Sequence, residues 1–358
     1  RAGQIFTNPS LAATLLAIAE GGKAAYYHGR IAQAVVKAVQ AAGGCMEAAD
    51  LAAHKSEWVE PISTTYRGFR VWECPPNGQG LAALLALNIL EGFDLASLAW
   101  DDPRRLHWML EAMRLAFLDA GRYIADPQIA PVPTAGLLDK AYAAERRRLI
   151  LPERANPDLA PGRPPGSSGT VYFSVVDGQG NACSFINSNY MGFGTAIVPE
   201  GCGFSLQNRG HNFSLTAGHP NVLAPGKRPY HTIIPALATR ESDGSLYASF
   251  GVMGGFMQPQ GHVQVLTALV DDGLDPQAAL DRPRWCIDPA ADGQAELEEG
   301  ISSEILARLT AMGHPLRLVS SFQRQNFGRG QVILRDPVSG VLCAGSDPRA
   351  DGAAVPLV

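Results

Sequence analysis

Thr170 lies where cleavage of the peptide bond before it would give the residue a free α-amine and could make it a catalytic nucleophile. Thr170 follows a stretch, residues 151–169, with five prolines and three glycines, and it precedes a run, 171–176, that is β-branched or aromatic at five of six positions. We expect the stretch to be a mobile linker and the run to be a strand buried on both faces. After a cut between Gly169 and Thr170, the new α-amine could take the proton of the threonine hydroxyl, which then attacks a carbonyl carbon. An ordinary linker followed by a strand is the alternative.

The same hydroxyl could make the cut. Attack by Thr170 on the carbonyl carbon of Gly169 gives an ester that water then resolves. Gly169 suits this step because it has no Cβ and tolerates a strained backbone. We therefore predict that Thr170 acts twice, first in cutting the precursor and then as the nucleophile in turnover, where its freed amine is the general base.

A glycine pair later in the chain could hold the oxygen that becomes negative during such an attack. Gly254 and Gly255 end the segment 251–255 (GVMGG), and glycine lets backbone N–H groups approach an oxyanion closely. A tight strand-to-helix turn and a phosphate loop are the alternatives. The phosphate loop is disfavoured because no Lys-Ser/Thr follows the glycines and no GxGxxG spacing is present.

Segments spread from about residue 3 to residue 351 resemble the γ-glutamyltranspeptidase family, in the family's order. They are 66–68 (YRG), 74–80 (CPPNGQG), 170–177 (TVYFSVVD), 180–184 (GNACS), 193–195 (FGT), 225–229 (PGKRP), 251–255 (GVMGG) and 345–349 (GSDPR). The resemblance implies an α+β fold, the αββα sandwich of N-terminal-nucleophile hydrolases, in which two stacked antiparallel sheets lie between helical layers. It also implies a precursor that is cut into a large and a small subunit.

The resemblance sets the expected domain organisation. Residues 1–169 would be the C-terminal part of the large subunit and 170–358 the small subunit, together one structural domain. The chain starts at Arg1 without a signal peptide, and the family has a further long N-terminal segment, so we expect a fragment of the precursor. In the family that segment supplies an arginine for the substrate carboxylate, and no position here matches it. A homodimer of processed heterodimers is a further expectation.

Residues near the nucleophile are also implied by the resemblance. Ser188 matches a second hydroxyl that hydrogen-bonds the nucleophile. The family usually has an asparagine two positions later, where this chain has Tyr190; a shift of one residue would let Asn189 supply the amide. Ordinary turn chemistry is the alternative for both Ser188 and Asn189.

Three departures from the family fall at substrate-binding positions. Asn212 matches the acidic residue that binds the α-amino group of a γ-glutamyl substrate, Arg209 matches a nearby glutamine, and His231-Thr232 match a serine pair. A neutral amide cannot offer an ammonium the charge-assisted bond, worth about 1.5–3 kcal/mol, that a carboxylate offers. We therefore expect a substrate with a free carboxylate and no α-ammonium, such as oxamate or a dicarboxylic monoamide, and not glutathione. The alternative is that Arg209 makes a structural salt bridge and Asn212 caps a turn.

Composition sets the remaining bounds. A chain of 358 residues that is 46% hydrophobic can bury a large core, and a net charge of −5 gives no reason to expect nucleic acid or an anionic membrane as partner. No apolar run reaches the ~20 residues that span a bilayer. Six scattered cysteines without CxxC favour free thiols in a reducing compartment, so we expect a cytoplasmic protein. No cofactor motif occurs, and no zinc spacing joins His211, His219, His231 and His262, so we expect neither cofactor nor metal.

The element pattern is mostly helical before residue 150 and mixed after residue 170. Asn8-Pro9-Ser10 should start a helix that ends at Gly21-Gly22, and Asp101-Asp102-Pro103 a second one with an apolar stripe. We predict helices at 260–271 and 302–312, and strands at 171–177, 181–187, 203–207, 232–239, 246–250, 294–298, 315–319 and 330–335. Helical layers that flank stacked antiparallel sheets would suit this pattern.

Three functions are compatible with these residues. The first is an autoprocessing amidase, or γ-glutamyl hydrolase or transferase, and the second is a carboxylate-selective amidohydrolase, since some family members are oxamate amidohydrolases or cephalosporin acylases. The third is an unprocessed, inactive relative with a structural role, against which Thr170, Gly254 and Gly255 argue. Hydrolysis and transfer share one acyl-enzyme and differ only in whether water or an amine resolves it.

Overall fold

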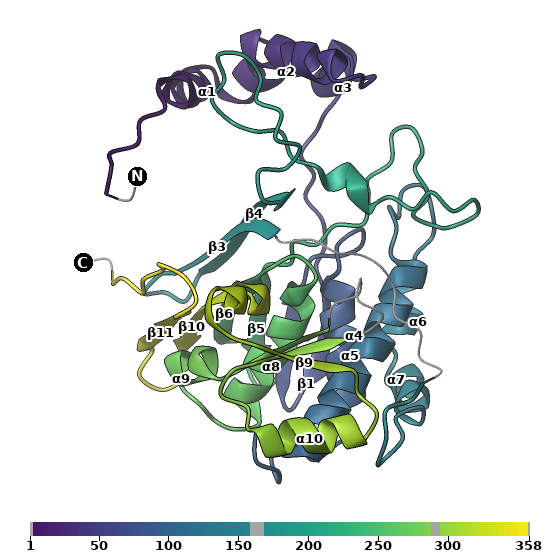
Figure 1. Ribbon diagram of the computed structural model, residues 1–358. Coiled ribbons are helices and arrows are strands. Elements are labelled where there is room, and N and C mark those ends of the chain that lie inside the picture. Colours follow the sequence, from purple (N-terminus) through teal and green to yellow (C-terminus); the bar gives the residue numbers. More distant parts are fainter. Residues whose placement is uncertain (1–2, 158–167, 288–293, 357–358) are drawn as a thin grey trace. The chain divides into compact units, whose positions relative to one another are not determined.

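The computed structural model describes residues 3–157, 168–287 and 294–356 (Figure 1). The chain divides into two compact units. The first contains residues 1–58 and 189–209, and the second contains residues 59–188 and 210–358.

The first unit is built from three helices, α1 (Pro9–Tyr27), α2 (Arg30–Ala41) and α3 (Ala48–Ala52), with the segment 189–209. As predicted, α1 begins at Asn8, whose side chain accepts the N–H of Leu11 at 3.0 Å. The predicted end at Gly21-Gly22 is confirmed in part: Gly22 has a non-helical backbone with a φ of 59°, and a second helical segment then continues beyond this kink to Tyr27.

The strand predicted at 203–207 is wrong, since this segment is irregular. It packs directly on the start of α1: a Cβ on Gly203, whose φ is 73°, would lie 2.3 Å from the backbone nitrogen of Leu11. Beside it the fully buried Cys202 packs with Ile31 and Val35 to form the small core of this unit. Close packing on a helix therefore replaces pairing with another strand.

The second unit contains a six-stranded antiparallel sheet. Its order is β1 (Ile62–Tyr66), β2 (Phe69–Glu73), β5 (Ala236–Arg240), β6 (Leu246–Met253), β10 (Arg329–Arg335) and β11 (Leu342–Ser346). The first two strands were not predicted. They are joined by Arg67 and Gly68, which have φ values of 51° and 86°, as a two-residue hairpin turn requires.

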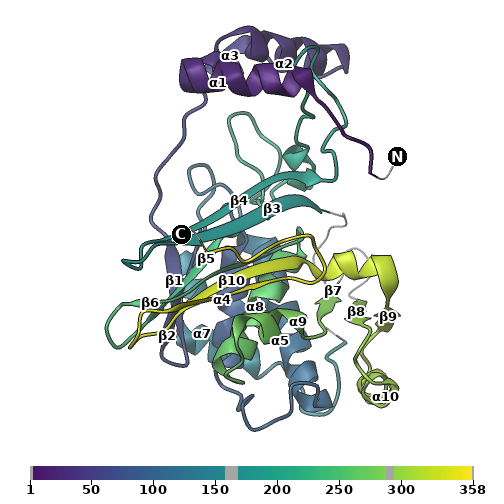
Figure 2. The ribbon, with the colours of Figure 1, turned by 90° about the vertical axis from the view of Figure 1, so that its left-hand side faces the viewer.

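Helices cover one face of this sheet. α4 (Gly80–Leu90) contacts β1 and β2, α8 (Met257–Val270) contacts β6, and α5 (Pro103–Tyr123) packs against α4 (Figure 2). The predicted start of α5 is confirmed, because Asp102 accepts the N–H of Arg104 at 2.8 Å. The predicted stripe is buried in the main core, at Leu106, Met109, Leu110, Met113 and Phe117.

A two-stranded sheet, β3 (Ser168–Val176) with β4 (Ala182–Met191), lies on the other face, where β3 contacts β6 and β10 (Figure 2). The expectation that β3 is buried on both faces is wrong. Thr170 and Tyr172 point inward and are buried, whereas Val171 and Phe173 are 65% and 46% exposed. Only one side of this thin layer packs on the larger sheet, so the side chains alternate between core and surface.

The remaining elements complete the second unit. β7 (Trp285–Ile287), β8 (Ala295–Glu298) and β9 (Leu316–Val319) form a three-stranded sheet, and α10 (Ser303–Ala311) lies between β8 and β9 in sequence. Shorter helices are α6 (Thr134–Leu137), α7 (Lys140–Arg147), α9 (Pro276–Asp281), η1 (Arg209–Asn212) and η2 (Ser321–Phe327). The predicted strands at 246–250, 294–298, 315–319 and 330–335 and the helices at 260–271 and 302–312 are confirmed. The strand predicted over 232–239 begins only at Ala236.

The predicted linker lies largely outside the described residues, because 158–167 are not described. The predicted division between residues 169 and 170 falls within β3, inside the second unit, and it stays a prediction about processing. All six cysteines are free thiols. In the described part of the chain, no helix has the length and apolar character needed to cross a membrane.

Candidate active site

Thr170 and Ser188 meet inside the second unit. Their strands, β3 and β4, are neighbours, and the Thr170 hydroxyl donates a hydrogen bond to the Ser188 hydroxyl with an Oγ1–Oγ distance of 2.9 Å. Thr170 is only 3% exposed. Because Ser188 accepts the proton of Thr170, this contact fixes the direction of the threonine oxygen's lone pairs.

A row of hydroxyls continues inward from Thr170 and fixes how β3 lies on β6. Tyr172 Oη is 2.7 Å from Ser174 Oγ and 2.8 Å from Ser184 Oγ, and Ser174 Oγ is 2.6 Å from Ser249 Oγ on β6. The Tyr172 ring covers Gly251, where a Cβ would come within 2.5 Å of it. Burial raises the pKa of Tyr172 to about 12, so its hydroxyl keeps its proton near neutral pH.

Gly254 and Gly255 connect β6 to α8. Their φ values of 143° and 62° favour glycine. The carbonyl oxygen of Gly254 accepts the N–H of Met257 at 3.0 Å, and that of Gly255 accepts the N–H of Gln258 at 3.2 Å. Both carbonyls therefore point into the first turn of the helix. The N–H of Gly255 shares a planar trans peptide with the carbonyl of Gly254, so it points the opposite way, out of the helix N-terminus, where the helix dipole favours negative charge.

Gln79 links the glycine pair to a second segment. Its Nε2 donates to the carbonyl oxygens of Thr232 at 2.7 Å and Gly255 at 2.8 Å, while its Oε1 accepts from the Tyr230 hydroxyl at 3.3 Å. Its side chain is fully buried. The sequence reasoning used the segment 74–80 only as a landmark and missed this residue. A glutamine between two glycines, directly before an apolar helix, was the available signal.

His231 and Thr232 lie on the segment that Gln79 contacts. The N–H of His231 donates to the Asn77 carbonyl at 2.9 Å, and the Asn77 side chain donates to the Pro229 carbonyl at 2.6 Å. The Nδ1 of His231 accepts the N–H of Ile233 at 3.3 Å, and Thr232 is fully buried. The turn at residues 77–79 therefore holds this segment in place.

Asn212 holds the turn η1 to Tyr230. Its Nδ2 donates to the Tyr230 carbonyl at 3.0 Å, and its backbone carbonyl accepts from Asn221 Nδ2 at 2.7 Å. Its Oδ1 is buried and has no hydrogen-bond partner among the described residues. The side chain thus presents an acceptor without the negative charge of the family's acidic residue.

Arg209, Tyr190 and Asn189 belong to the first unit, whereas the other predicted site residues belong to the second. The Arg209 guanidinium lies 4.8 Å from the centre of the Tyr190 ring, a cation–π contact between two residues that both depart from the family pattern. Burial lowers the pKa of Arg209 to about 10, which still leaves it charged at neutral pH. Asn189 Nδ2 donates to Ser205 Oγ at 3.3 Å.

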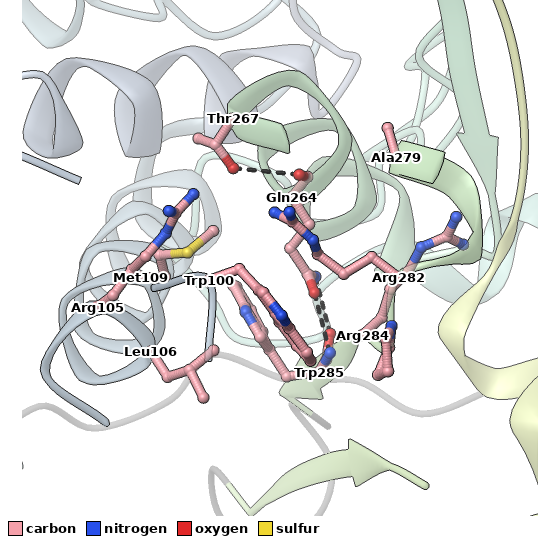
Figure 3. Close-up of a pocket in the computed structure, with 11 residues that line it drawn as sticks. Trp100, Arg105, Leu106, Met109, Gln264, Thr267, Ala279, Arg282, Arg284 and Trp285 are labelled. Carbon is pink, nitrogen blue, oxygen red and sulfur yellow. Dashed lines mark hydrogen bonds between the residues drawn. The ribbon is translucent and has the colours of Figure 1, made fainter. Parts of the chain in front are cut away.

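A separate pocket in the second unit contains none of the predicted site residues (Figure 3). Trp100, Arg105, Arg282 and Trp285 are among the residues that line it. Arg105 and Arg282 both pair with Asp272, at 2.7 and 2.5 Å. These contacts are those of a structural ion-pair cluster, and we assign the pocket no chemistry. No group of three or more His, Cys, Asp or Glu in the described ranges is arranged to hold a metal ion.

Comparisons with known proteins agree on one family. Residues 1–357 match the family described as gamma-glutamyltranspeptidase. The chain is 38% identical over 360 residues to the glutathione hydrolase-like YwrD proenzyme of Bacillus subtilis, and 34% identical over 357 residues to the oxamate amidohydrolase proenzyme of Klebsiella pneumoniae. Each alignment covers 99% of this chain and 66% of the relative.

A solved structure supports the same assignment. The crystal structure of cephalosporin acylase from Bacillus halodurans matches with a TM-score of 0.89 and 46% identity, over 99% of this chain and 63% of that chain. The chain thus spans 63% to 66% of the length of these three relatives. The predicted α+β fold of the N-terminal-nucleophile hydrolase type is confirmed by this match. The chain belongs to the γ-glutamyltranspeptidase family.

Proposed function

We propose that this chain carries the catalytic residues of an autoprocessing amidase whose nucleophile is Thr170. The observation that carries the proposal is the buried 2.9 Å hydrogen bond from the Thr170 hydroxyl to Ser188. Thr170 is also the first buried, inward-pointing side chain of β3 that the structure describes. The names of the curated relatives, which are hydrolase and amidohydrolase proenzymes, support a precursor that is cut.

The stacking of β3 on β6 supports a position for Thr170 beside the glycine pair. The contact between Tyr172 and Gly251 lies two residues away, along each strand, from the contact between Ser174 and Ser249. A further step of two residues takes Thr170 to a place opposite Met253. Because Gly254 follows Met253, the threonine oxygen and the glycine N–H groups would face a common space.

Autoprocessing then follows from the threonine hydroxyl. Its oxygen attacks the carbonyl carbon of Gly169, the C–N bond to Thr170 breaks, and the proton that the hydroxyl loses passes to the nitrogen, which becomes a free amine. Gly169 is now held as an ester on Oγ1. Water adds to the ester carbon and the C–O bond breaks, which releases Gly169 as a carboxylate and restores the hydroxyl.

Turnover of an amide would use the same oxygen with its new base. The α-amine of Thr170 takes the hydroxyl proton while the oxygen attacks the amide carbon, and the N–H groups of Gly254 and Gly255 would bind the oxyanion. The proton passes to the leaving amine as the C–N bond breaks, and an acyl ester stays on Thr170. Water hydrolyses the ester, or a second amine takes the acyl group.

For the substrate, we propose an acyl amide with a free carboxylate. Relative to the family pattern, Arg209 adds a positive charge, and Asn212 replaces an acid with a neutral acceptor. The oxamate amidohydrolase relative is compatible with this chemistry. A γ-glutamyl substrate is the second candidate, favoured by the 38% identity to a glutathione hydrolase-like proenzyme.

The proposal is tested by trapping the acyl-enzyme. The processed protein is mixed with oxamate or glutathione, quenched in acid within one turnover and mapped by peptide mass. We expect an added acyl mass on the peptide that begins at Thr170, with a higher kcat/KM for oxamate. Turnover with the acyl mass on another residue would contradict the assigned nucleophile. A preference for glutathione would contradict the assigned substrate.

A further inference from the structure

We propose that Gln79 is a positioning residue that sets the geometry of the Gly254–Gly255 oxyanion site. This inference rests on the proposed function, since it takes the same glycine pair to be the oxyanion-binding site. It adds a residue that lies outside the motifs from which the catalytic roles were predicted.

The hydrogen-bonding capacity of the Gln79 carboxamide matches its surroundings. A carboxamide nitrogen has two N–H bonds, and Nε2 has two acceptors, the carbonyl oxygens of Thr232 and Gly255, at 2.7 and 2.8 Å. Its oxygen accepts from the Tyr230 hydroxyl at 3.3 Å. A fully buried amide with both ends bonded is held in one orientation, because losing any of these bonds inside the protein is costly.

The fixed Gln79 side chain in turn restrains the backbone of the glycine pair. The Gly255 carbonyl accepts from Gln79 and from the N–H of Gln258, so the peptide that follows Gly255 is tied to two elements. Without a side chain, Gly254 and Gly255 would otherwise have wide backbone freedom. An oxyanion site works by having its donors fixed before the charge develops, and Gln79 supplies that fixation from outside the loop.

The contacts also join the two fragments that processing would create. Gln79 precedes the proposed cut at Gly169, whereas Thr232 and Gly255 follow it, 153 and 176 residues further along the chain than Gln79. The small subunit would therefore depend on the large subunit for the order of its own oxyanion site. The segment of the large subunit that supplies Gln79 leads directly into the buried helix α4.

The test compares two glutamine variants of nearly equal shape. Gln79→Met removes the carboxamide at the glycine pair. Gln264→Met removes a carboxamide that bonds backbone groups of Trp285, at 2.9 Å to both the carbonyl and the N–H, away from that pair. The kcat and KM for oxamate and for glutathione are measured for both variants, with kcat normalised to the cleaved fraction from intact mass. Thermal unfolding gives the stability of each.

For Gln79→Met we expect kcat to fall about 10²-fold, as when one oxyanion donor is misplaced, with KM changed less than about threefold. Gln264→Met should keep kcat within about twofold at a similar loss of thermal stability. Gln79→Asn keeps an amide but shortens it by one methylene, so it should fold and lose roughly tenfold in kcat.

The outcomes separate this inference from the proposed function. A wild-type protein that is uncut, or that turns over neither amide, would remove the proposed function itself. A cut, active wild type beside a Gln79→Met variant with unchanged kcat would overturn the role of Gln79 alone. A rise in KM without a fall in kcat would overturn it as well. If Gln79→Met does not fold, Gln79→Asn decides, and wild-type kcat in that variant contradicts the inference.

Discussion

Thr170 and Ser188 share a hydrogen bond of 2.9 Å between hydroxyls on neighbouring strands. The bond connects β3, which begins two residues before Thr170, to the far half of β4. It brings together two residues that are 18 positions apart in the sequence, and that the family resemblance paired by role alone. In the proposed mechanism, Ser188 orients the threonine oxygen before the new amine is formed.

Removal of this contact should slow catalysis without unfolding the protein. For Ser188→Ala we expect kcat to fall about tenfold, since one hydrogen bond to a reacting hydroxyl is worth about 1 kcal/mol or somewhat more. Ser184→Ala, also on β4, removes a hydroxyl that bonds Tyr172 and should leave kcat nearly unchanged. Steady-state kinetics with oxamate and glutathione provides the comparison. Equal losses in the two variants would mean that Ser188 acts only through the stability of the sheet.

The buried charge of Arg209 should matter for a substrate that carries a carboxylate. We expect Arg209→Gln, which restores the family's residue type, to raise KM for oxamate by about tenfold or more, because a charge-assisted hydrogen bond is worth about 1.5–3 kcal/mol. Lys37→Gln is the control, since it removes a positive charge from the surface of the same unit, where Lys37 pairs with Glu200. Unchanged KM in Arg209→Gln would show that Arg209 has a structural role and does not bind the substrate carboxylate.

The segment 345–349, one of the motifs of the family resemblance, forms an ion-pair network. Asp347 is fully buried, pairs with Arg284 at 2.7 Å and with Arg349 at 3.1 Å, and accepts the N–H of Gly330 at 2.8 Å. We expect Asp347→Asn to lower the free energy of unfolding by about 3–5 kcal/mol, because it leaves the buried Arg284 without its carboxylate partner, whereas Arg349 keeps its pair with Glu298.

Urea unfolding measures this loss. Glu200→Gln is the matched control, since it removes a carboxylate from an exposed pair with Lys37 and should cost less than about 1 kcal/mol. A similarly small loss for Asp347→Asn would mean that the network contributes little to stability.

A buried histidine pair should make stability depend on pH. His107 Nε2 lies 2.7 Å from the Leu151 carbonyl, so it must donate there, and its Nδ1 then accepts from His314 Nε2 at 2.7 Å. Burial lowers the pKa of His107, and it lowers that of His314 to about 3. Below a pH of about 6.5 both histidines are protonated in the unfolded chain, whereas the buried pair in the folded protein stays neutral. The free energy of unfolding should therefore fall as the pH drops from there toward 4.

The slope gives the test. As the pH falls, the free energy of unfolding of the wild type should decrease by up to about 1.36 kcal/mol per pH unit for each such histidine. That of His314→Gln should decrease less over the same range, because one titrating group is gone. Urea midpoints at pH 7, 6, 5 and 4 for both proteins would measure it. Parallel curves would contradict the assigned neutral state of His314.

Local sequence signals predicted the elements with clear caps or alternation. The helix after Asp102 has a cap and an apolar stripe, and the run after Thr170 has strong β propensity, so both were located. α4 was missed because all eleven of its residues are buried, which removes the polar face that reveals a helix. The hairpin of β1 and β2 was missed although Arg67-Gly68 is a suitable turn. At 203–207, strand-like residues instead pack on a helix, and only tertiary contacts show this.

Residues of the candidate site were predictable only where a motif of the family resemblance assigns a role to a particular position. Thr170 and Ser188 follow from the resemblance, and the structure brings them together. The glycines on both sides of Gln79 single it out, but its role could not be assigned from them, because that role depends on the carbonyl groups of Thr232 and Gly255, which lie far away in the sequence. The contact between Tyr190 and Arg209 is not predictable for the same reason, although both residues depart from the family pattern.

In the proposed function, Thr170 cuts the chain and becomes its nucleophile. The intact mass of the purified full-length protein, measured beside that of a Thr170→Ala variant, shows whether this cut occurs and whether it needs Thr170. We predict two fragments in the wild type, one beginning at Thr170, and a single uncut chain in the variant. A folded wild type that stays uncut, or a Thr170→Ala variant that is cut at the same bond, would contradict the account.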